Sequence, residues 1–334
     1  MNSVNHQIRL AARPTGLPDA STWDLTTGPV PEPESGEFVV RLSHLSIDPA
    51  MRGWMNDVPS YIPPVEIGAV MRALGIGRVT ASEHPDFAVG DHVSGVFGVQ
   101  EFARSDGGGA TKVDPSLAPL PTYLGALGMT GLTAYFGLLD VGRLKDGETV
   151  VVSGAAGAVG SVAGQIAKAK GCRVIGIAGG PEKCGWIVDE LGFDVAIDYK
   201  SEDVRRSLRE HAPDRVDVFF DNVGGEVLDA ALTRLARGAR IVICGGISQY
   251  NAEQARGPSN YLALIAARAS MTGFLVFDYA ARYPEAISEL AGWLREGKLV
   301  SREQVVEGGV QAFPEALLKL FAGENIGKLV LEVS

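Results

Sequence analysis

The segment VVVSGAAGAVG (Val150–Gly160) leads from β-branched residues into small residues and then into SVAGQIAKAK (161–170). This order predicts a buried strand over Thr149–Ser153, a tight turn, and a helix over Ala158–Lys170. Glycine at 154, 157 and 160 lets a diphosphate group approach the backbone amides at the start of the helix. Tight packing of a helix on a strand also selects glycine, so the glycines alone are weak evidence for a nucleotide site. The strands that follow the turn strengthen this prediction. Its place between strand and helix predicts a dinucleotide site.

The residues after this turn repeat a pattern of apolar strand and amphipathic helix. Further strands are predicted at Arg173–Ala178, Val195–Asp198, Val216–Phe220 and Arg240–Cys244. Helices are predicted between them at Glu182–Leu191, Glu202–His211 and Glu226–Ala236. Strands that alternate with helices form a parallel, doubly wound sheet, so the predicted fold class is α/β.

The two ends of the chain follow other patterns. The first part contains short strands, such as Glu37–Ile47 and Ala69–Thr80, separated by turn residues, which predicts a β-barrel domain. After the doubly wound part, the predicted elements are a strand at Met271–Val276, helices at Tyr283–Glu296 and Pro314–Ala322, and a last strand at Lys328–Val333. We expect this tail to return to the first domain.

Composition limits the class of partner. The chain has 334 residues, 46% of them hydrophobic, which favours two domains with large cores. A net charge of −10 without a block of basic residues argues against a nucleic-acid partner and favours a small-molecule substrate. Residues Met1–Arg13 show no leader pattern, and no apolar run approaches about 18 residues, which predicts a cytoplasmic protein without a membrane partner.

The cysteines and histidines do not favour a metal site. Cys172, Cys184 and Cys244 are scattered and fall in no Cys/His ligand spacing, so reduced thiols are expected. His44 and His92 alternate with apolar residues on predicted strands, where a lone imidazole is more often structural. A mechanism that depends on zinc is therefore not expected.

The end of the second predicted strand indicates which nicotinamide nucleotide binds. An NAD site usually has Asp or Glu there to bind the ribose hydroxyls, whereas this chain has Ala178-Gly179-Gly180. Lys183, in the helix that follows, is placed to meet a 2′-phosphate. The alternative is that Lys183 is a solvated charge in the first turn of that helix. We expect NADP(H) as the cofactor.

Several motifs resemble those of a known family. They are GMTGLTAYFGLL (128–139), GAAGAVGSVAGQIAKAKGCRVIGIAGGPEKC (154–184), DNVGGEVLDAAL (221–232), GGISQYN (245–251) and GENIGKLV (323–330), with SIDPAMRGWM (46–55) and SYIPP (60–64) nearer the N-terminus. In these motifs the chain resembles the zinc-independent medium-chain dehydrogenase/reductase superfamily, in its branch of prostaglandin reductases and alkenal double-bond reductases. The resemblance implies a GroES-like catalytic domain (1–128 with 297–334), a Rossmann domain (129–296), NADPH bound in the cleft between them, and a homodimer.

The resemblance also implies individual site residues. Pyrophosphate contacts fall on Gly157, Ala158, Val159 and Gly160, and 2′-phosphate contacts on Lys183 and Tyr199. Further cofactor contacts fall on Asn222, Cys244 and Asn325. Phe274, Leu275 and Val276 match the segment along the nicotinamide, Met129 and Thr133 match residues on its other side, and Tyr61 matches a residue that faces the substrate. The apolar members of this set could equally be core residues.

Tyr250 is the candidate catalytic residue. It lies in the loop after the fifth predicted strand, at the carboxyl end of the sheet, and it matches the family's active-site tyrosine. Hydride addition to the β-carbon of an enone produces an enolate, which needs a hydrogen-bond donor when no metal is present. A tyrosine ordinarily titrates near about 10, so its hydroxyl can donate at neutral pH. We expect NADPH-dependent reduction of α,β-unsaturated ketones or aldehydes, with Tyr250 stabilising the enolate.

Two other functions are compatible with the same residues. A quinone reductase shares the two-domain plan and the NADPH turn, but it delivers electrons to a ring. A non-catalytic NADPH-binding sensor would keep the fold without turnover, since a fold does not establish a function. In that case Tyr250 would be an exposed aromatic residue in a polar loop.

Overall fold

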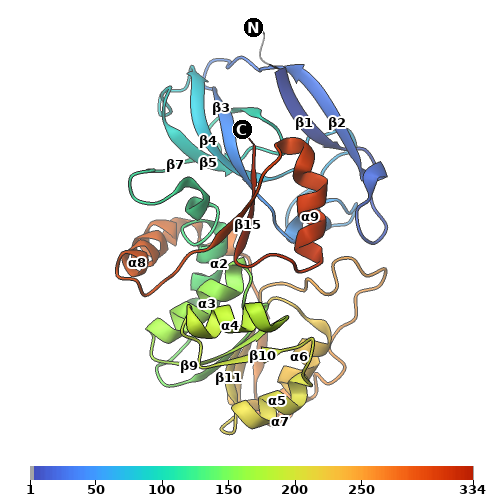
Figure 1. Ribbon diagram of the computed structural model, residues 1–334, viewed down its shortest axis with the longest axis vertical. Helices are drawn as coiled ribbons and strands as arrows, with labels where there is room; N and C mark the ends of the chain where they lie inside the picture. The colour runs from blue at the N-terminus through green and yellow to red at the C-terminus, as the bar shows by residue number, and fades with distance from the viewer. Residues whose placement is uncertain (1–3, 334) are drawn as a thin grey trace. The chain divides into compact units, whose positions relative to one another are not determined.

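The computed structural model describes residues 4–333, and its contacts divide the chain into two compact units. Unit 1 comprises Met1–Leu124 with Glu303–Ser334, described over 4–124 and 303–333. Unit 2 comprises Gly125–Arg302. The two ends of the chain therefore belong to one unit, and the middle of the chain forms the other (Figure 1).

Unit 1 is built mainly from antiparallel strands. Its seven-stranded sheet has the order β14-β15-β3-β4-β5-β7, with β6 paired to β3, and β1 and β2 form a separate pair. The strands are β1 (Val4–Leu10), β2 (Trp23–Pro29), β3 (Phe38–Ser46), β4 (Leu74–Ser82), β5 (His92–Val96), β6 (Phe102–Ser105), β7 (Thr111–Lys112), β14 (Glu303–Val306) and β15 (Lys328–Glu332). The helices are η1 (Ala20–Thr22), α1 (Ala50–Trp54), η2 (Leu120–Tyr123), η5 (Val310–Ala312) and α9 (Phe313–Phe321).

Both ends of the chain contribute to the core of unit 1. Strand β15 pairs antiparallel with β3, so that Val330 lies opposite Ser46. Phe38 of β3 and Phe313 of α9 are fully buried in the same cluster. Burial of such a side chain contributes about 1.5–3 kcal/mol, so packing holds the C-terminal helix and strand to the N-terminal sheet.

Unit 2 is a six-stranded parallel sheet with helices, as the alternating pattern predicts. The strand order is β10-β9-β8-β11-β12-β13, and every neighbouring pair is parallel. The strands are β8 (Thr149–Ser153), β9 (Arg173–Ala178), β10 (Val195–Asp198), β11 (Val216–Asp221), β12 (Leu235–Ile243) and β13 (Ser270–Gly273). The helices are α2 (Met129–Phe136), η3 (Gly137–Val141), α3 (Ala158–Ala169), α4 (Pro181–Asp189), α5 (Val204–His211), α6 (Gly225–Leu232), α7 (Ala263–Ala267), η4 (Val276–Arg282) and α8 (Tyr283–Arg295).

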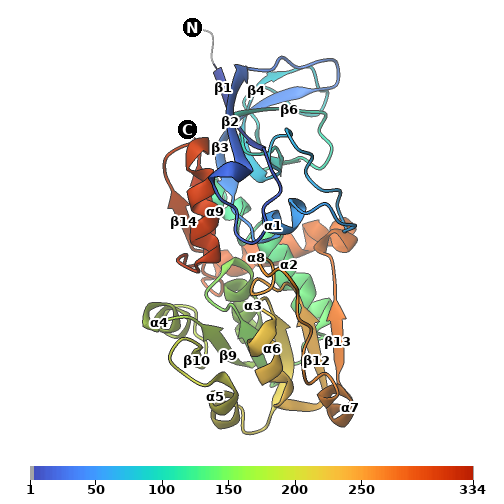
Figure 2. The same cartoon turned by 90° about the vertical axis from the view of Figure 1, so that its right-hand side faces the viewer.

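The strand order of unit 2 determines where its functional loops lie. Strands β8 and β11 are neighbours although β9 and β10 separate them in sequence, so the order of strands reverses between them. Ligands of such sheets bind at the carboxyl ends of the strands at this reversal. The residues that follow β8, β11 and β12 therefore share one edge of the sheet, while β13 lies at the side edge beyond β12 (Figure 2).

The α/β fold class predicted from the sequence is confirmed, but one predicted helix is wrong in extent. The helix expected over Glu226–Ala236 is α6, which ends at Leu232, and Leu235 and Ala236 already belong to β12. Strand β12 starts earlier than expected because Gly238, with a φ of +80°, lets the chain bend within the strand. The register of β12 against β11 shifts beside this bend.

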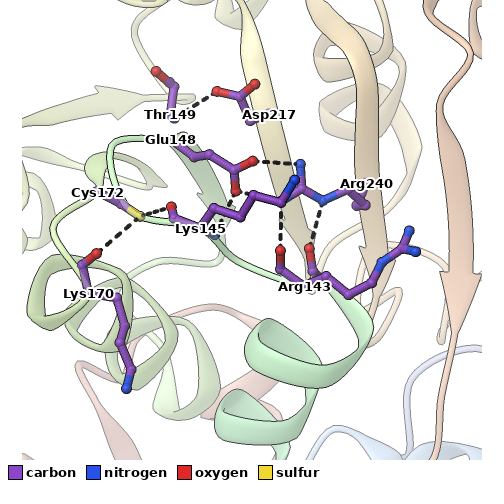
Figure 3. A network of polar contacts seen from close by, with 9 residues as sticks. Arg143, Lys145, Glu148, Thr149, Lys170, Cys172, Asp217 and Arg240 are labelled. Carbon is purple, nitrogen blue, oxygen red and sulfur yellow. Dashed lines mark hydrogen bonds and ion pairs between the residues drawn. The ribbon is translucent and has the colours of Figure 1, made fainter.

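Arg240 is nearly buried and binds the residues that follow η3 to the amino-terminal end of the sheet (Figure 3). This end lies opposite the edge that carries the functional loops. Arg240 of β12 donates to the carbonyl oxygens of Gly142 at 2.7 Å and Arg143 at 3.1 Å. It also forms a bidentate pair with Glu148 at 2.9 and 2.5 Å. The side chains of Arg240 and Glu148 are only 10% and 15% exposed, so water screens this pair little.

Candidate functional site

The turn after β8 leaves the start of α3 open to an anion. Gly154 has a φ of +60°, and Gly157 is the N-cap of α3, where no side chain caps the helix. A Cβ atom on Gly160 would lie 2.3 Å from the carbonyl oxygen of Gly154, so any other residue here would force the turn to move. The amides of the first turn, at Ala158 and Val159, face no capping side chain, and the helix dipole favours a negative charge there.

A cationic cluster lies at the ends of β9 and β10. Burial lowers the pKa of Lys183 on α4, and the positive charge of Lys200 lowers it further. The ring of Tyr199 lies against Gly179, where a Cβ atom would come within 2.8 Å of it. Two like charges held close to each other favour binding of a multivalent anion such as a phosphate.

Lys200 is a member of this cluster that the sequence reasoning missed. It follows Tyr199 directly, and that adjacency is the signal that could have identified it. The nearby carboxylate of Asp198 accepts hydrogen bonds from Gly180 N at 2.8 Å and Lys200 N at 3.0 Å. These bonds hold its pKa below the ordinary value and hold the loop that carries Lys200 beside the loop after β9.

The residues expected on the two sides of the nicotinamide are brought together within unit 2. The hydroxyl of Tyr283 donates to the carbonyl oxygen of Val276 at 3.0 Å and lies 3.9 Å from the sulfur of Met129. The ring of Phe274 packs on the far end of α2, where a Cβ atom on Gly137 would lie 2.6 Å from it. Leu275 is partly buried beside Phe274. The hydroxyl of Thr133 donates to the carbonyl oxygen of Met129 within α2.

Asn222 and Cys244 follow neighbouring strands and share one hydrogen-bond network. The Asn222 side chain donates to the carbonyl oxygen of Ser153 at 2.7 Å, and its backbone amide donates to the Ser153 hydroxyl at 2.8 Å. The backbone amide of Cys244 donates to the carbonyl oxygen of Asp221 at 2.9 Å. Burial raises the pKa of the Cys244 thiol to about 12, so this thiol is neutral and unreactive at physiological pH.

Tyr250 lies on the same edge of the sheet. Its hydroxyl oxygen accepts a hydrogen bond from Gly246 N at 3.1 Å. The loop that carries it contacts the turn after β11, because Ile247 N donates to Asn222 O at 3.2 Å. A Cβ atom on Gly245 would lie 3.0 Å from the Tyr250 hydroxyl, so glycine at 245 admits the tyrosine at this place.

Tyr61 and Asn325 belong to unit 1. The Tyr61 hydroxyl accepts a hydrogen bond from Trp54 Nε1 at 3.1 Å, and the guanidinium of Arg72 lies 5.6 Å from the centre of the Trp54 ring. Tyr61 is 49% exposed. Asn325 is buried, and its side-chain amide donates to Gly327 O at 2.8 Å, so that amide stabilises its own turn.

No group of three or more His, Cys, Asp or Glu side chains within residues 4–333 could hold a metal ion. No helix in the same range is long and apolar enough to cross a membrane.

The chain is similar to known oxidoreductases over nearly its whole length. Two family models match the chain, "N-terminal domain of oxidoreductase" over residues 6–113 and "Zinc-binding dehydrogenase" over residues 158–292. The NADPH-dependent curcumin reductase of Escherichia coli is 42% identical over 99% of this chain and 97% of its own length. The NADP(+)-dependent 2-alkenal reductase of Nicotiana tabacum is 41% identical over 99% of this chain and 98% of its own. The crystal structure of CurA from Vibrio vulnificus in complex with NADPH is 45% identical, with a TM-score of 0.93 over 98% of this chain and 99% of that one.

Proposed function

The chain belongs to the medium-chain dehydrogenase/reductase family, and from this premise we propose that it reduces the carbon–carbon double bond of α,β-unsaturated ketones or aldehydes with NADPH. The family resemblance found in the motifs is thereby confirmed. The chain is an NADP-dependent oxidoreductase, and relatives named for reduction of curcumin and of 2-alkenals support a double-bond substrate.

The observation that carries the proposal is the grouping of functional loops at one edge of the unit 2 sheet. The open start of α3 at Gly157 and the hydroxyl of Tyr250 follow β8 and β12, whose carboxyl ends share that edge. The cluster of Lys183, Tyr199 and Lys200 follows β9 and β10 on the same edge. This arrangement fits a dinucleotide whose diphosphate meets α3 and whose 2′-phosphate meets the lysines.

Bound NADPH would supply the hydride that reduces the β-carbon of the substrate. The residues of the chain bind the cofactor, orient the substrate and stabilise the charge that develops on the carbonyl oxygen. We assign this last role to the Tyr250 hydroxyl, which donates a hydrogen bond to the enolate oxygen. The Tyr250 oxygen accepts the hydrogen bond from Gly246 N with one of its lone pairs. The α-carbon then takes a proton that originates in solvent.

The other site residues that the family resemblance implies take supporting roles in the proposal. Asn222, Cys244, Met129, Thr133 and Phe274–Val276 line the nicotinamide end of the site, Tyr61 contacts the substrate, and Asn325 contacts the cofactor. The free thiols at Cys172, Cys184 and Cys244 support a reducing location such as the cytoplasm.

We also propose that the protein is a homodimer. Strand β13 pairs only with β12 among the described strands, and three of its four residues are exposed. Beside it, Tyr261, Leu262 and Ile265 are 58%, 61% and 73% exposed. An unpaired sheet edge next to exposed apolar side chains is typical of an interface between subunits. Light scattering of the purified protein measures its mass directly, and a monomeric mass would contradict the proposal.

The experiment that tests the reaction follows NADPH absorbance with enones, enals and quinones and identifies the products by mass spectrometry. We expect saturated ketone or aldehyde products. Tyr250→Phe is expected to slow hydride transfer about 100-fold, as loss of an oxyanion donor does, without weakening NADPH binding. Tyr123→Phe is the matched control, because its hydroxyl bonds only to the backbone of Asp114 in the described contacts. An allylic alcohol or a quinol as the sole product would refute the proposal.

A further inference from the structure

Asp221 is a fully buried carboxylate at the end of β11 that the mechanism above does not use. Its Oδ1 atom accepts hydrogen bonds from the Ser153 hydroxyl at 2.7 Å, from Val223 N at 3.0 Å and from Gly224 N at 3.1 Å. Its Oδ2 atom accepts a second bond from Gly224 N at 3.2 Å. One carboxylate thus joins the end of β8 to the turn after β11.

No described residue forms a salt bridge with Asp221. Burial raises its pKa above the ordinary value, while the bonds from Ser153, Gly224 and Val223 oppose that rise. Burial of a carboxylate without a cation beside it costs free energy. A turn can be stabilised by a neutral side chain without that cost. The position of this carboxylate therefore calls for an explanation beyond turn formation.

Hydrogen bonds lead from this turn to the loop of Tyr250. The carbonyl oxygen of Val223 accepts bonds from Ser248 N at 3.2 Å and from the Ser248 hydroxyl at 2.6 Å. A Cβ atom on Gly225 would lie 3.0 Å from the Ser248 hydroxyl oxygen, so the two loops are in close contact. Gly246, two residues before Ser248, donates to the hydroxyl of Tyr250.

Asn222, by contrast, is held without the Asp221 side chain. Its backbone amide and its side-chain amide both bond to Ser153. Loss of the Asp221 carboxylate would therefore release Val223 and Gly224 and weaken the support that their turn gives to Ser248. Asn222 would keep its side-chain bond to Ser153 O, and its carbonyl oxygen would still accept the bond from Ile247 N.

From this asymmetry we infer that Asp221 is a positioning residue for Tyr250, acting through the turn at Val223–Gly224 and the loop at Gly246–Ser248. The inference rests on the proposed role of Tyr250. A displacement of about 1 Å in a group that stabilises a transition state can slow a reaction about 100-fold even when the substituted residue is remote from the chemistry. Asp221 thus governs the rate of hydride transfer and has little influence on cofactor affinity.

The test compares Asp221→Ala and Asp221→Asn with Asp217→Ala, measured by single-turnover hydride transfer, NADPH fluorescence titration and urea unfolding. Asp217 is the matched control, because it lies on the same strand and accepts one backbone bond, from Thr149 N at 2.9 Å, at the opposite end of the sheet. We expect Asp221→Ala to slow hydride transfer at least about tenfold with less than about a threefold change in the NADPH Kd. Asp221→Asn should restore part of the rate, because the two lone pairs of its amide oxygen can accept the bonds that Oδ1 receives from the Ser153 hydroxyl and Val223 N.

A double-mutant cycle with Tyr250→Phe separates positioning from general damage. If Asp221 acts through Tyr250, Asp221→Ala should slow the Tyr250→Phe enzyme less than about twofold. An equal slowing in both backgrounds would overturn the inference, and so would a wild-type rate in Asp221→Ala. Where Asp221→Ala fails to fold, Ser248→Ala in the same cycle tests the same connection, because it removes the bond from the Ser248 hydroxyl to Val223 O. If Tyr250→Phe itself is as fast as wild type, the proposed function of Tyr250 fails first, and that outcome is distinguishable from failure of the Asp221 inference.

Discussion

Substitution of Gly160 by alanine should abolish tight NADPH binding at a small cost in stability. The added Cβ would lie 2.3 Å from Gly154 O and 3.0 Å from Ala155 Cα, about 1 Å closer than an ordinary contact. Overpacking of this kind costs about 1–3 kcal/mol, and the higher helix propensity of alanine offsets about 1 kcal/mol of it. The free energy of unfolding without cofactor should therefore fall by about 0–2 kcal/mol.

The effect on the cofactor is larger, because the turn must move to relieve the contact. Each charge-assisted hydrogen bond from a backbone amide to phosphate contributes about 1.5–3 kcal/mol. Loss of one or two such bonds raises the Kd for NADPH about 100-fold. At an NADPH concentration of about 100 times the wild-type Kd, the cofactor stabilises the wild type by about 2.7 kcal/mol, and it should stabilise Gly160→Ala by only about 0.4 kcal/mol.

The assay is urea unfolding with and without NADPH, together with fluorescence titration of the cofactor. Gly292→Ala is the matched control, since Gly292 lies within α8 and a Cβ there meets nothing within 4 Å. This control should gain about 0.5–1 kcal/mol in stability and bind NADPH normally. Wild-type NADPH affinity in Gly160→Ala would refute the assignment of the diphosphate to this turn.

Three further predictions concern the lysine cluster and the Arg240 network. Lys183→Ala should weaken NADPH binding about 10–100-fold and NADH binding less than about twofold, measured by fluorescence titration; equal losses for the two nucleotides would contradict a 2′-phosphate contact. Only protonated Lys183 attracts phosphate, and burial and Lys200 lower its pKa. As the pH rises, the affinity of the wild type for NADPH should therefore begin to fall at a lower pH than the ordinary pKa of lysine would predict, whereas its affinity for NADH should not change. Arg240→Met should lower the free energy of unfolding by about 3 kcal/mol, because it leaves the nearly buried Glu148 carboxylate without its partner. Substitution of the exposed Arg295 by Met is the control and should change the free energy of unfolding by less than about 0.5 kcal/mol. Similar values for the two variants in urea unfolding would show that the buried pair contributes little.

The local features of unit 2 were predictable because they depend on residues that are close in sequence. The β-branched run at Val150–Val152, the glycines of the turn and the apolar face of α3 predict a strand, a turn and a helix without reference to the rest of the chain. The boundary between α6 and β12 was predicted less well, since residues 233–236 suit a helix by pattern, whereas Leu235 and Ala236 belong to β12 and Leu235 pairs with Val216 of β11.

The composition of the site depended on tertiary structure, because its members are far apart in the chain. Lys200 joins Lys183 only through the alignment of β9 and β10, and no spacing rule connects these two residues. The bonds of Asp221 reach 68 residues back to Ser153, and those of the following turn reach forward to the loop of Tyr250. Sequence alone determined the parallel fold, the cofactor turn and the family, since each is written in short-range patterns of glycine and apolar residues. Only the folded chain decided which polar groups hold Tyr250, because a hydrogen bond depends on distance and direction between groups that strand order brings together.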